Sequence, residues 1–220
     1  MKKYAFCRLS PLFAVAFAVL FAAPCLSLAQ EKQVVTPAMV AIKKITGVTG
    51  NEWRQKTPNV GTKPAGKQRE WGVIDAEFDL AANAPKFIDE LVVNFTVMLQ
   101  VAPNTDIRLV DGKKFSLLKL SVRYADVESG RGKKVGAVIL PNAILRYGVP
   151  VGIAVDLVVD GKTIASKSEQ TGDLKNVKGR WWEDPKVVDS SVVAKREGLL
   201  VDRAKTPFSL VSIDEYEVSK

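Results

Sequence analysis

The chain has 220 residues, contains no histidine and only two cysteines, Cys7 and Cys25, and has a formal net charge of +8. Without histidine it cannot form a Ser-His-Asp triad, a histidine zinc site or an imidazole base, so these common catalytic devices are excluded. Enzymes that use only carboxylates, lysine or tyrosine stay compatible with this composition. We nevertheless expect a protein that is not an enzyme and that holds no metal or cofactor.

The N-terminus has the pattern of a cleavable signal peptide. Basic residues precede an apolar run, Leu12 to Ala23, which is shorter than the roughly 20 residues that a membrane span needs. The small residues Ser27 and Ala29 predict cleavage before Gln30; an uncleaved anchor is the alternative. We therefore expect a signal peptide at 1–29 and a single domain at 30–220 without a transmembrane span. Its location would be the periplasm, the outer membrane or the cell surface.

Cleavage would also change the composition of the chain. Both cysteines would be lost, which excludes disulfides and thiolate chemistry in the mature protein. The 29 basic and 24 acidic residues that remain give a net charge of +5. Part of the basic excess lies between Lys32 and Arg69, and within this stretch residues 51–69 read as a long loop because of their prolines and glycines. Such a patch can bind an anionic glycan or lipid, whereas export disfavours nucleic acid. A solvated loop is the simpler interpretation.

Short alternating segments separated by Gly, Pro, Asn and Asp predict an all-β sandwich or barrel of eight or nine strands. The clearest strand is Leu91–Val101, where every odd position is apolar, so we expect Phe95 and Val97 in the core. Asp160-Gly161 predicts a tight two-residue hairpin turn, and Asp111-Gly112 a weaker one. The expected strands are Val40–Val48, Trp71–Leu80, Leu91–Val101, Ser116–Tyr124, Val135–Leu140, Val149–Val159, Lys162–Lys167, Leu199–Val201 and Leu210–Glu217.

Helix signals are scarce. Pro141–Arg146 predicts one short helix that ends at Gly148, and Ser190–Glu197 predicts a second one that ends at Gly198.

Two groups of residues are candidates for a site. Asp75, Glu77 and Asp79 alternate on one strand face, and a glycosidase needs a carboxylate pair, but acids in this pattern are typical of a solvated strand face. The string Arg180-Trp181-Trp182 could stack on a sugar, anchor a protein partner or simply plug the core. Trp53-Arg54 allows the same interpretations.

The C-terminal third contains an ordered series of short motifs. The motifs are Trp181-Trp182, Glu197-Gly198-Leu199-Leu200, Lys205-Thr206-Pro207-Phe208 and Asp214-Glu215-Tyr216-Glu217. This series resembles a group of small exported proteins of Verrucomicrobia, one of which is encoded beside the pilus-type genes of the mucin-degrading gut bacterium Akkermansia. This resemblance implies an immunoglobulin-like sandwich and a link to type IV pilus-like machinery. The chain lacks the long N-terminal pilin helix, which favours an accessory role.

Together these observations predict a non-enzymatic binding or assembly module whose partners are other envelope or pilus-like proteins. The alternative is a protein that binds mucin or another envelope glycan through Trp181 and Trp182, and an anionic glycan is a possible ligand. The candidate contact residues are Arg180, Trp181, Trp182, Trp53 and Arg54.

Overall fold

The structure, a computed structural model, describes residues 34–47, 53–58, 69–101 and 110–210. The chain divides into two units, Met1–Lys32 and Gln33–Lys220, and all of the described residues belong to the second. The expected signal peptide, most of the basic loop and the expected strand at Leu210–Glu217, apart from its first residue, lie outside the described residues. None of the helices in the described ranges is long and apolar enough to cross a membrane.

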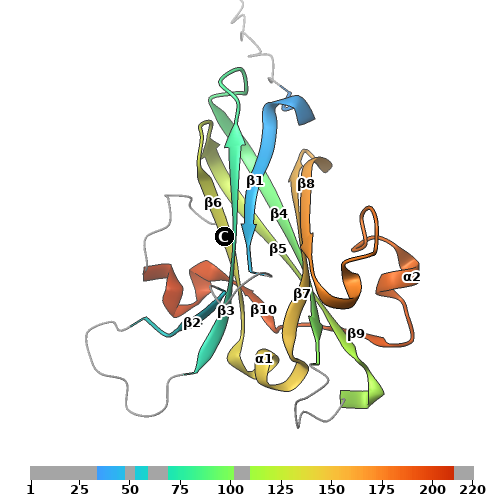
Figure 1. The fold of residues 1–220 in the computed structure, drawn as a ribbon. Helices are drawn as coiled ribbons and strands as arrows, with labels where there is room; N and C mark the ends of the chain where they lie inside the picture. Colours follow the sequence, from blue (N-terminus) through green and yellow to red (C-terminus); the bar gives the residue numbers. More distant parts are fainter. Residues whose placement is uncertain (1–33, 48–52, 59–68, 102–109, 211–220) are drawn as a thin grey trace, which may run out of the picture. The chain divides into compact units, whose positions relative to one another are not determined.

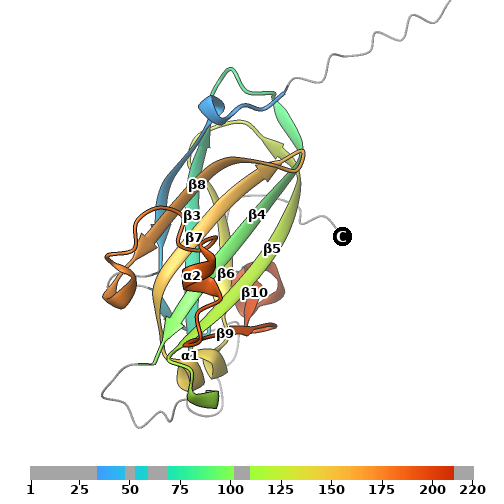
Figure 2. The same cartoon turned by 90° about the vertical axis from the view of Figure 1, so that its right-hand side faces the viewer.

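The described residues form an all-β sandwich, as the alternating pattern predicted (Figures 1 and 2). One sheet has the order β1-β3-β6-β10, with β2 also paired to β3, and the other has the order β8-β7-β4-β5-β9. All neighbouring strands are antiparallel except β5 and β9. The strands are β1 (Val40–Thr46), β2 (Arg54–Lys56), β3 (Glu70–Leu80), β4 (Phe87–Gln100), β5 (Phe115–Glu128), β6 (Lys133–Ile139), β7 (Val149–Val159), β8 (Lys162–Gln170), β9 (Val193–Arg196) and β10 (Leu200–Asp202).

The core lies between the two sheets and follows the period-two pattern of the sequence. On β4, Leu91, Val93, Phe95, Val97 and Leu99 are fully buried, which confirms the predicted inner face of this strand. The inner face of β3 meets them with Ile74, Ala76, Phe78 and Leu80. Full burial of one such large apolar side chain stabilises the fold by about 1.5–3 kcal/mol, so these two strands make a large contribution to its stability.

The turn between β7 and β8 has the predicted form. Asp160 and Gly161 both have positive φ angles, 49° and 73°, as a two-residue turn of this type requires. Asp111 and Gly112 also have positive φ angles, 57° and 67°. The helix α1 (Pro141–Tyr147) also forms where it was predicted and ends at Gly148.

The second predicted helix is wrong. Residues 193–196, within the expected helix, form the strand β9, which pairs in parallel with the start of β5. An isolated helix of eight residues gains few internal hydrogen bonds, whereas the edge of β5 supplies backbone partners at once. A shorter helix, α2 (Pro185–Val188), forms just before it, where the Asp184 side chain accepts a hydrogen bond from the Lys186 N–H. The predicted loop at 51–69 was also incomplete, because it contains β2.

Both sheets are covered in part on their outer faces as well. Phe208, which is 1% exposed, packs on Val73 and Val138 of the first sheet and meets the Trp71 ring edge to face. The segment that contains α2 covers the outer face of the second sheet. These outer layers decide which of the candidate residues remain accessible.

Candidate functional site

Trp181 and Trp182 lie in the outer layer of the second sheet and are buried, at 0% and 5% exposure. A side chain at Gly152 of β7 would meet the Trp181 ring at 2.9 Å, so the glycine makes room for the indole. The two rings are tilted by 78° to each other. A sugar platform needs exposed and coplanar rings, so the buried and tilted rings of Trp181 and Trp182 do not fit the carbohydrate-binding alternative. The two indoles are buried because packing an indole against the apolar face of the sheet is more favourable in free energy than leaving it in water.

Arg180 fastens this tryptophan segment to the sheet. Its Nη2 donates to the Asp156 carboxylate at 3.0 Å, and its Nε donates to Glu183 at 2.6 Å. The guanidinium also lies 4.9 Å from the centre of the Trp182 ring. The hydrogen bond with Glu183 is the main cause that raises the pKa of Arg180 and lowers the pKa of Glu183. Although 38% of its side chain is exposed, Arg180 has its donors directed at residues of its own chain.

Trp53 and Arg54 belong to the other sheet. Trp53 is 5% exposed and joins the main core. Arg54 lies above it, with its guanidinium 4.8 Å from the centre of the Trp53 ring and 3.5 Å from the Glu70 carboxylate. The structure therefore brings Arg180, Trp181 and Trp182 together but places Trp53 and Arg54 elsewhere. Of the five predicted contact residues, only the two arginines are accessible.

The strand β2 presents an edge that the sequence patterns did not reveal. Its residues Arg54, Gln55 and Lys56 are all exposed. The Val73 N–H donates to the Trp53 carbonyl at 2.7 Å, and antiparallel strands alternate inward and outward backbone groups. The N–H and C=O groups of Arg54 and Lys56 consequently point away from β3. Within the described ranges, no strand pairs with this outer edge.

Two of the three alternating acids of β3, Asp75 and Asp79, carry structural contacts. Asp75 accepts a hydrogen bond from Arg203 at 2.7 Å, which ties the segment after β10 to the sheet. Asp79 accepts the Gly132 N–H at 2.8 Å and pairs with Lys43 at 3.4 Å. The bond from Gly132, followed by Lys43, lowers the pKa of Asp79. No cluster of acidic, histidine or cysteine side chains in the described part of the chain is arranged to hold a metal ion.

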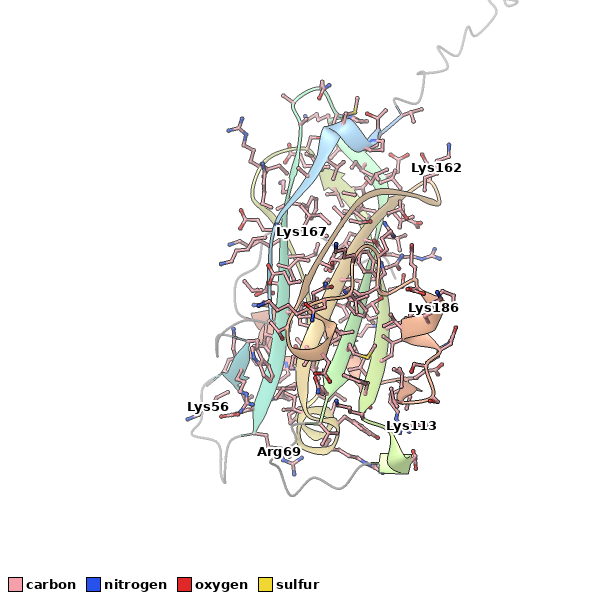
Figure 3. All side chains as sticks on the ribbon, turned by 45° about the vertical axis from the view of Figure 1, so that its right-hand side comes forward. Lys56, Arg69, Lys113, Lys162, Lys167 and Lys186 are labelled. Atoms are coloured by element: carbon pink, nitrogen blue, oxygen red, sulfur yellow. The ribbon has the colours of Figure 1, made fainter. Side chains whose placement is uncertain are left out.

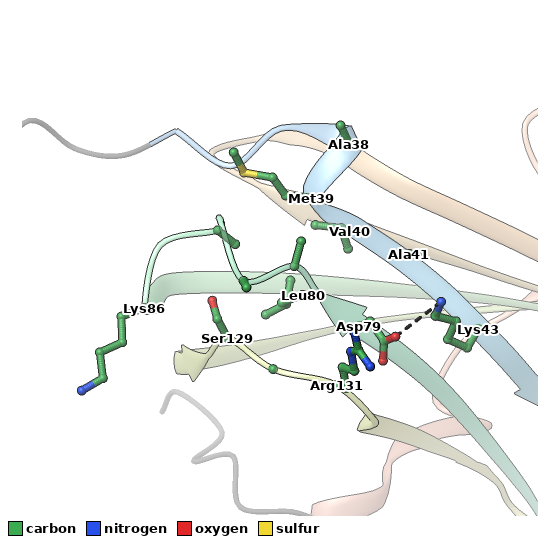
Figure 4. Close-up of a pocket in the computed structure, with 14 residues that line it drawn as sticks. Ala38, Met39, Val40, Ala41, Lys43, Asp79, Leu80, Lys86, Ser129 and Arg131 are labelled. Atoms are coloured by element: carbon green, nitrogen blue, oxygen red, sulfur yellow. Dashed lines mark ion pairs between the residues drawn. The ribbon is translucent and has the colours of Figure 1, made fainter.

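A pocket of about 650 Å³ opens at one end of the sandwich (Figure 4). It lies between the residues that begin β1, the turn from β3 to β4 and the turn from β5 to β6. Met39, Leu80 and Ala84 supply apolar lining, and Lys43, Lys86 and Arg131 supply positive charge. No sequence pattern predicts this pocket, because its residues come from three separate stretches, none of which has a motif.

Comparison with known proteins places this fold. A family model matches residues 36–220, and no curated protein matches the chain. A crystal structure of a protein from Akkermansia muciniphila has 20% sequence identity and a TM-score of 0.61, and the match covers 82% of this chain and 92% of that one. That similarity shows a shared fold. Because the family model spans most of the chain, the protein belongs to the family it describes, and the resemblance to the immunoglobulin-like proteins of Akkermansia and its relatives is confirmed.

Proposed function

We propose that this protein is a non-enzymatic binding or assembly module, exported to the cell envelope and associated with a type IV pilus-like surface system. The open, basic edge of β2 is the observation that carries this proposal. The signal-peptide pattern supports export, and the family resemblance supports the link to pilus-like machinery.

An open strand edge binds a partner by adding one of the partner's strands to the sheet. At β2, the outward backbone groups of Arg54 and Lys56 supply the hydrogen bonds, and the two basic side chains favour a partner strand that carries acidic residues. A three-residue edge can form only a few such bonds, so it favours a weak, transient contact over a permanent one.

A pair of substitutions at Lys56 tests this mode of binding. Lys56→Pro removes the N–H that points outward but none that bonds β3, whereas Lys56→Ala removes the charge and keeps the N–H. In pull-downs from envelope extract, we expect Lys56→Pro to lose a partner that Lys56→Ala still recovers. Lys162→Ala, at the β7–β8 turn and far from Lys56 in Figure 3, is the control for loss of a surface charge.

Two outcomes contradict the proposal. A folded Lys56→Pro protein that recovers the same partners in the same amounts rules out pairing at this edge. Equal losses in Lys56→Pro and Lys56→Ala would assign the contact to the lysine side chain instead of the backbone.

A further inference from the structure

The pocket at the end of the sandwich carries charges that its own residues do not balance. Lys43 is paired with Asp79, the only acidic residue among the lining residues. Lys86 and Arg131 form no ion pair with another described residue, and Lys86 instead lies 5.2 Å from the centre of the Phe87 ring. The lining therefore has a net positive charge and can accept further carboxylates.

The positive charges lie at both ends of an apolar floor. Figure 4 shows Lys86 at one end, with its side chain directed away from Leu80, Arg131 with Lys43 and Asp79 at the other, and Met39 and Leu80 between them. An aliphatic carboxylate of the fatty-acid type has an anion at one end only and would leave one cation unmatched. The lining also includes no aromatic residue, so it lacks the rings on which sugars stack.

We propose that this pocket binds an acidic peptide segment of a protein partner, in which one apolar side chain lies between two carboxylates. The apolar side chain would rest on Met39 and Leu80, and the two carboxylates would meet Lys86 and Arg131. The volume of about 650 Å³ falls in the range of sites that hold a few residues or a small ligand. The inference rests on the proposed function as a protein-binding module, but it concerns a surface formed by other residues than β2.

The cations are solvent-exposed, so the interaction should weaken strongly as salt screens them. A fluorescent peptide with a Glu-Leu-Glu centre, titrated with the exported protein in low salt, is expected to bind with saturation. Peptides with Lys-Leu-Lys and Glu-Ser-Glu centres test the need for charge and for the apolar side chain, and both are expected to bind more weakly.

Charge reversal locates the site. We expect Lys86→Glu with Arg131→Glu to weaken binding of the Glu-Leu-Glu peptide by about tenfold or more. Lys175→Glu with Lys186→Glu makes the same change of charge at exposed positions outside the pocket and should leave the affinity within about twofold of the wild-type value. Thermal unfolding followed by circular dichroism checks that both double variants fold.

The proposal is overturned if the wild-type protein does not bind the acidic peptide in low salt, or if the two double variants bind it equally well. It is also overturned if decanoate binds in the pocket and the peptide does not. Lys56→Pro is expected to bind the peptide as the wild type does, so failure at the pocket and failure at the β2 edge are distinguishable.

Discussion

Asp156 lies on the outer face of β7, is 8% exposed and accepts hydrogen bonds from three side chains. The donors are Ser166 Oγ at 2.6 Å, Trp182 Nε1 at 2.9 Å and Arg180 Nη2 at 3.0 Å. A carboxylate this deeply buried is stable only when its oxygens are bonded. Asp156 therefore joins the sheet to the tryptophan segment, and the polar contacts of that segment serve the fold.

Within this network, the loss of unfolding free energy caused by a substitution should increase with the burial of the group that is removed or left unpaired. Asp156→Ala leaves the buried Trp182 N–H without its acceptor and is expected to cost about 2 kcal/mol of unfolding free energy. Arg180→Ala removes a partly exposed group while Asp156 keeps two donors, so we expect a cost of about 1 kcal/mol or less. Urea denaturation of both variants measures the two losses in unfolding free energy, and a larger loss for Arg180→Ala than for Asp156→Ala would contradict the prediction.

The core of the sandwich makes a simpler prediction. Phe95 is fully buried on β4 between the two sheets. Phe95→Ala should lower the free energy of unfolding by about 3–5 kcal/mol, because it removes apolar contacts and leaves a cavity. Equilibrium denaturation tests this; an unchanged midpoint would mean that the inner face of β4 is assigned wrongly. Asn94→Ala, one residue before it on the half-buried opposite face, serves as the comparison.

At the scale of elements, the turns differ in how tightly they are packed. Gly148 ends α1 with a φ angle of 93°, and a Cβ there would lie 2.0 Å from the Gln100 carbonyl oxygen at the end of β4. Gly161, in the β7–β8 turn, also has a positive φ angle of 73°, but nothing lies within 4 Å of a Cβ at that position. The first glycine allows two elements to approach, whereas the second serves the local turn only.

Alanine substitutions at these two glycines distinguish the cost of an unfavourable backbone conformation from the cost of steric overlap with a neighbouring element. Gly161→Ala is expected to cost about 1 kcal/mol, because it imposes only an unfavourable backbone conformation. Gly148→Ala adds overlap with the backbone of β4 and should cost about 3 kcal/mol or more. Thermal and urea denaturation give both values. Equal losses would show that the α1–β7 junction can move away from Gln100 without cost.

At the scale of the whole described domain, the two sheets are linked near Tyr124. Its side chain extends from β5 and is buried, and it interacts with the Gly136 backbone of β6 and with the nearby Asp202 carboxylate of β10. Burial, reinforced by Asp202, raises the pKa of the Tyr124 phenol well above its ordinary value of about 10. The folded protein therefore keeps this phenol neutral at pH values where the unfolded chain ionises it.

Stability should consequently fall in alkaline solution. The contribution of Tyr124 is fully present below the unfolded pKa of about 10 and is lost progressively as the pH rises from there through the raised folded pKa. Urea midpoints measured from pH 8 to pH 11 check this slope, and Tyr124→Phe should flatten it because phenylalanine does not titrate. Equal slopes in the two proteins would show that Tyr124 is not the source of the alkaline loss.

The sequence by itself determined the features that depend on neighbours along the chain. The alternation in residues 91–101 predicted the inner face of β4, and Asp160-Gly161 predicted the β7–β8 turn. Both features depend on neighbouring residues only, because the side chains of a strand alternate with a period of two residues and a tight turn depends on the φ angles of two adjacent residues. The C-terminal motifs indicated the family for a related reason, since they are contiguous strings.

Only the tertiary structure decided which of the candidate residues remain accessible. Paired tryptophans read equally well as a binding platform or as core, and the space above Gly152 settled that Trp181 is buried. Residues 193–196 became a strand because the distant edge of β5 offers backbone partners. The β2 edge and the pocket between Lys86 and Arg131 likewise form only when separate segments of the chain lie side by side in the fold. A pattern of neighbouring residues does not specify which distant segments will pack together.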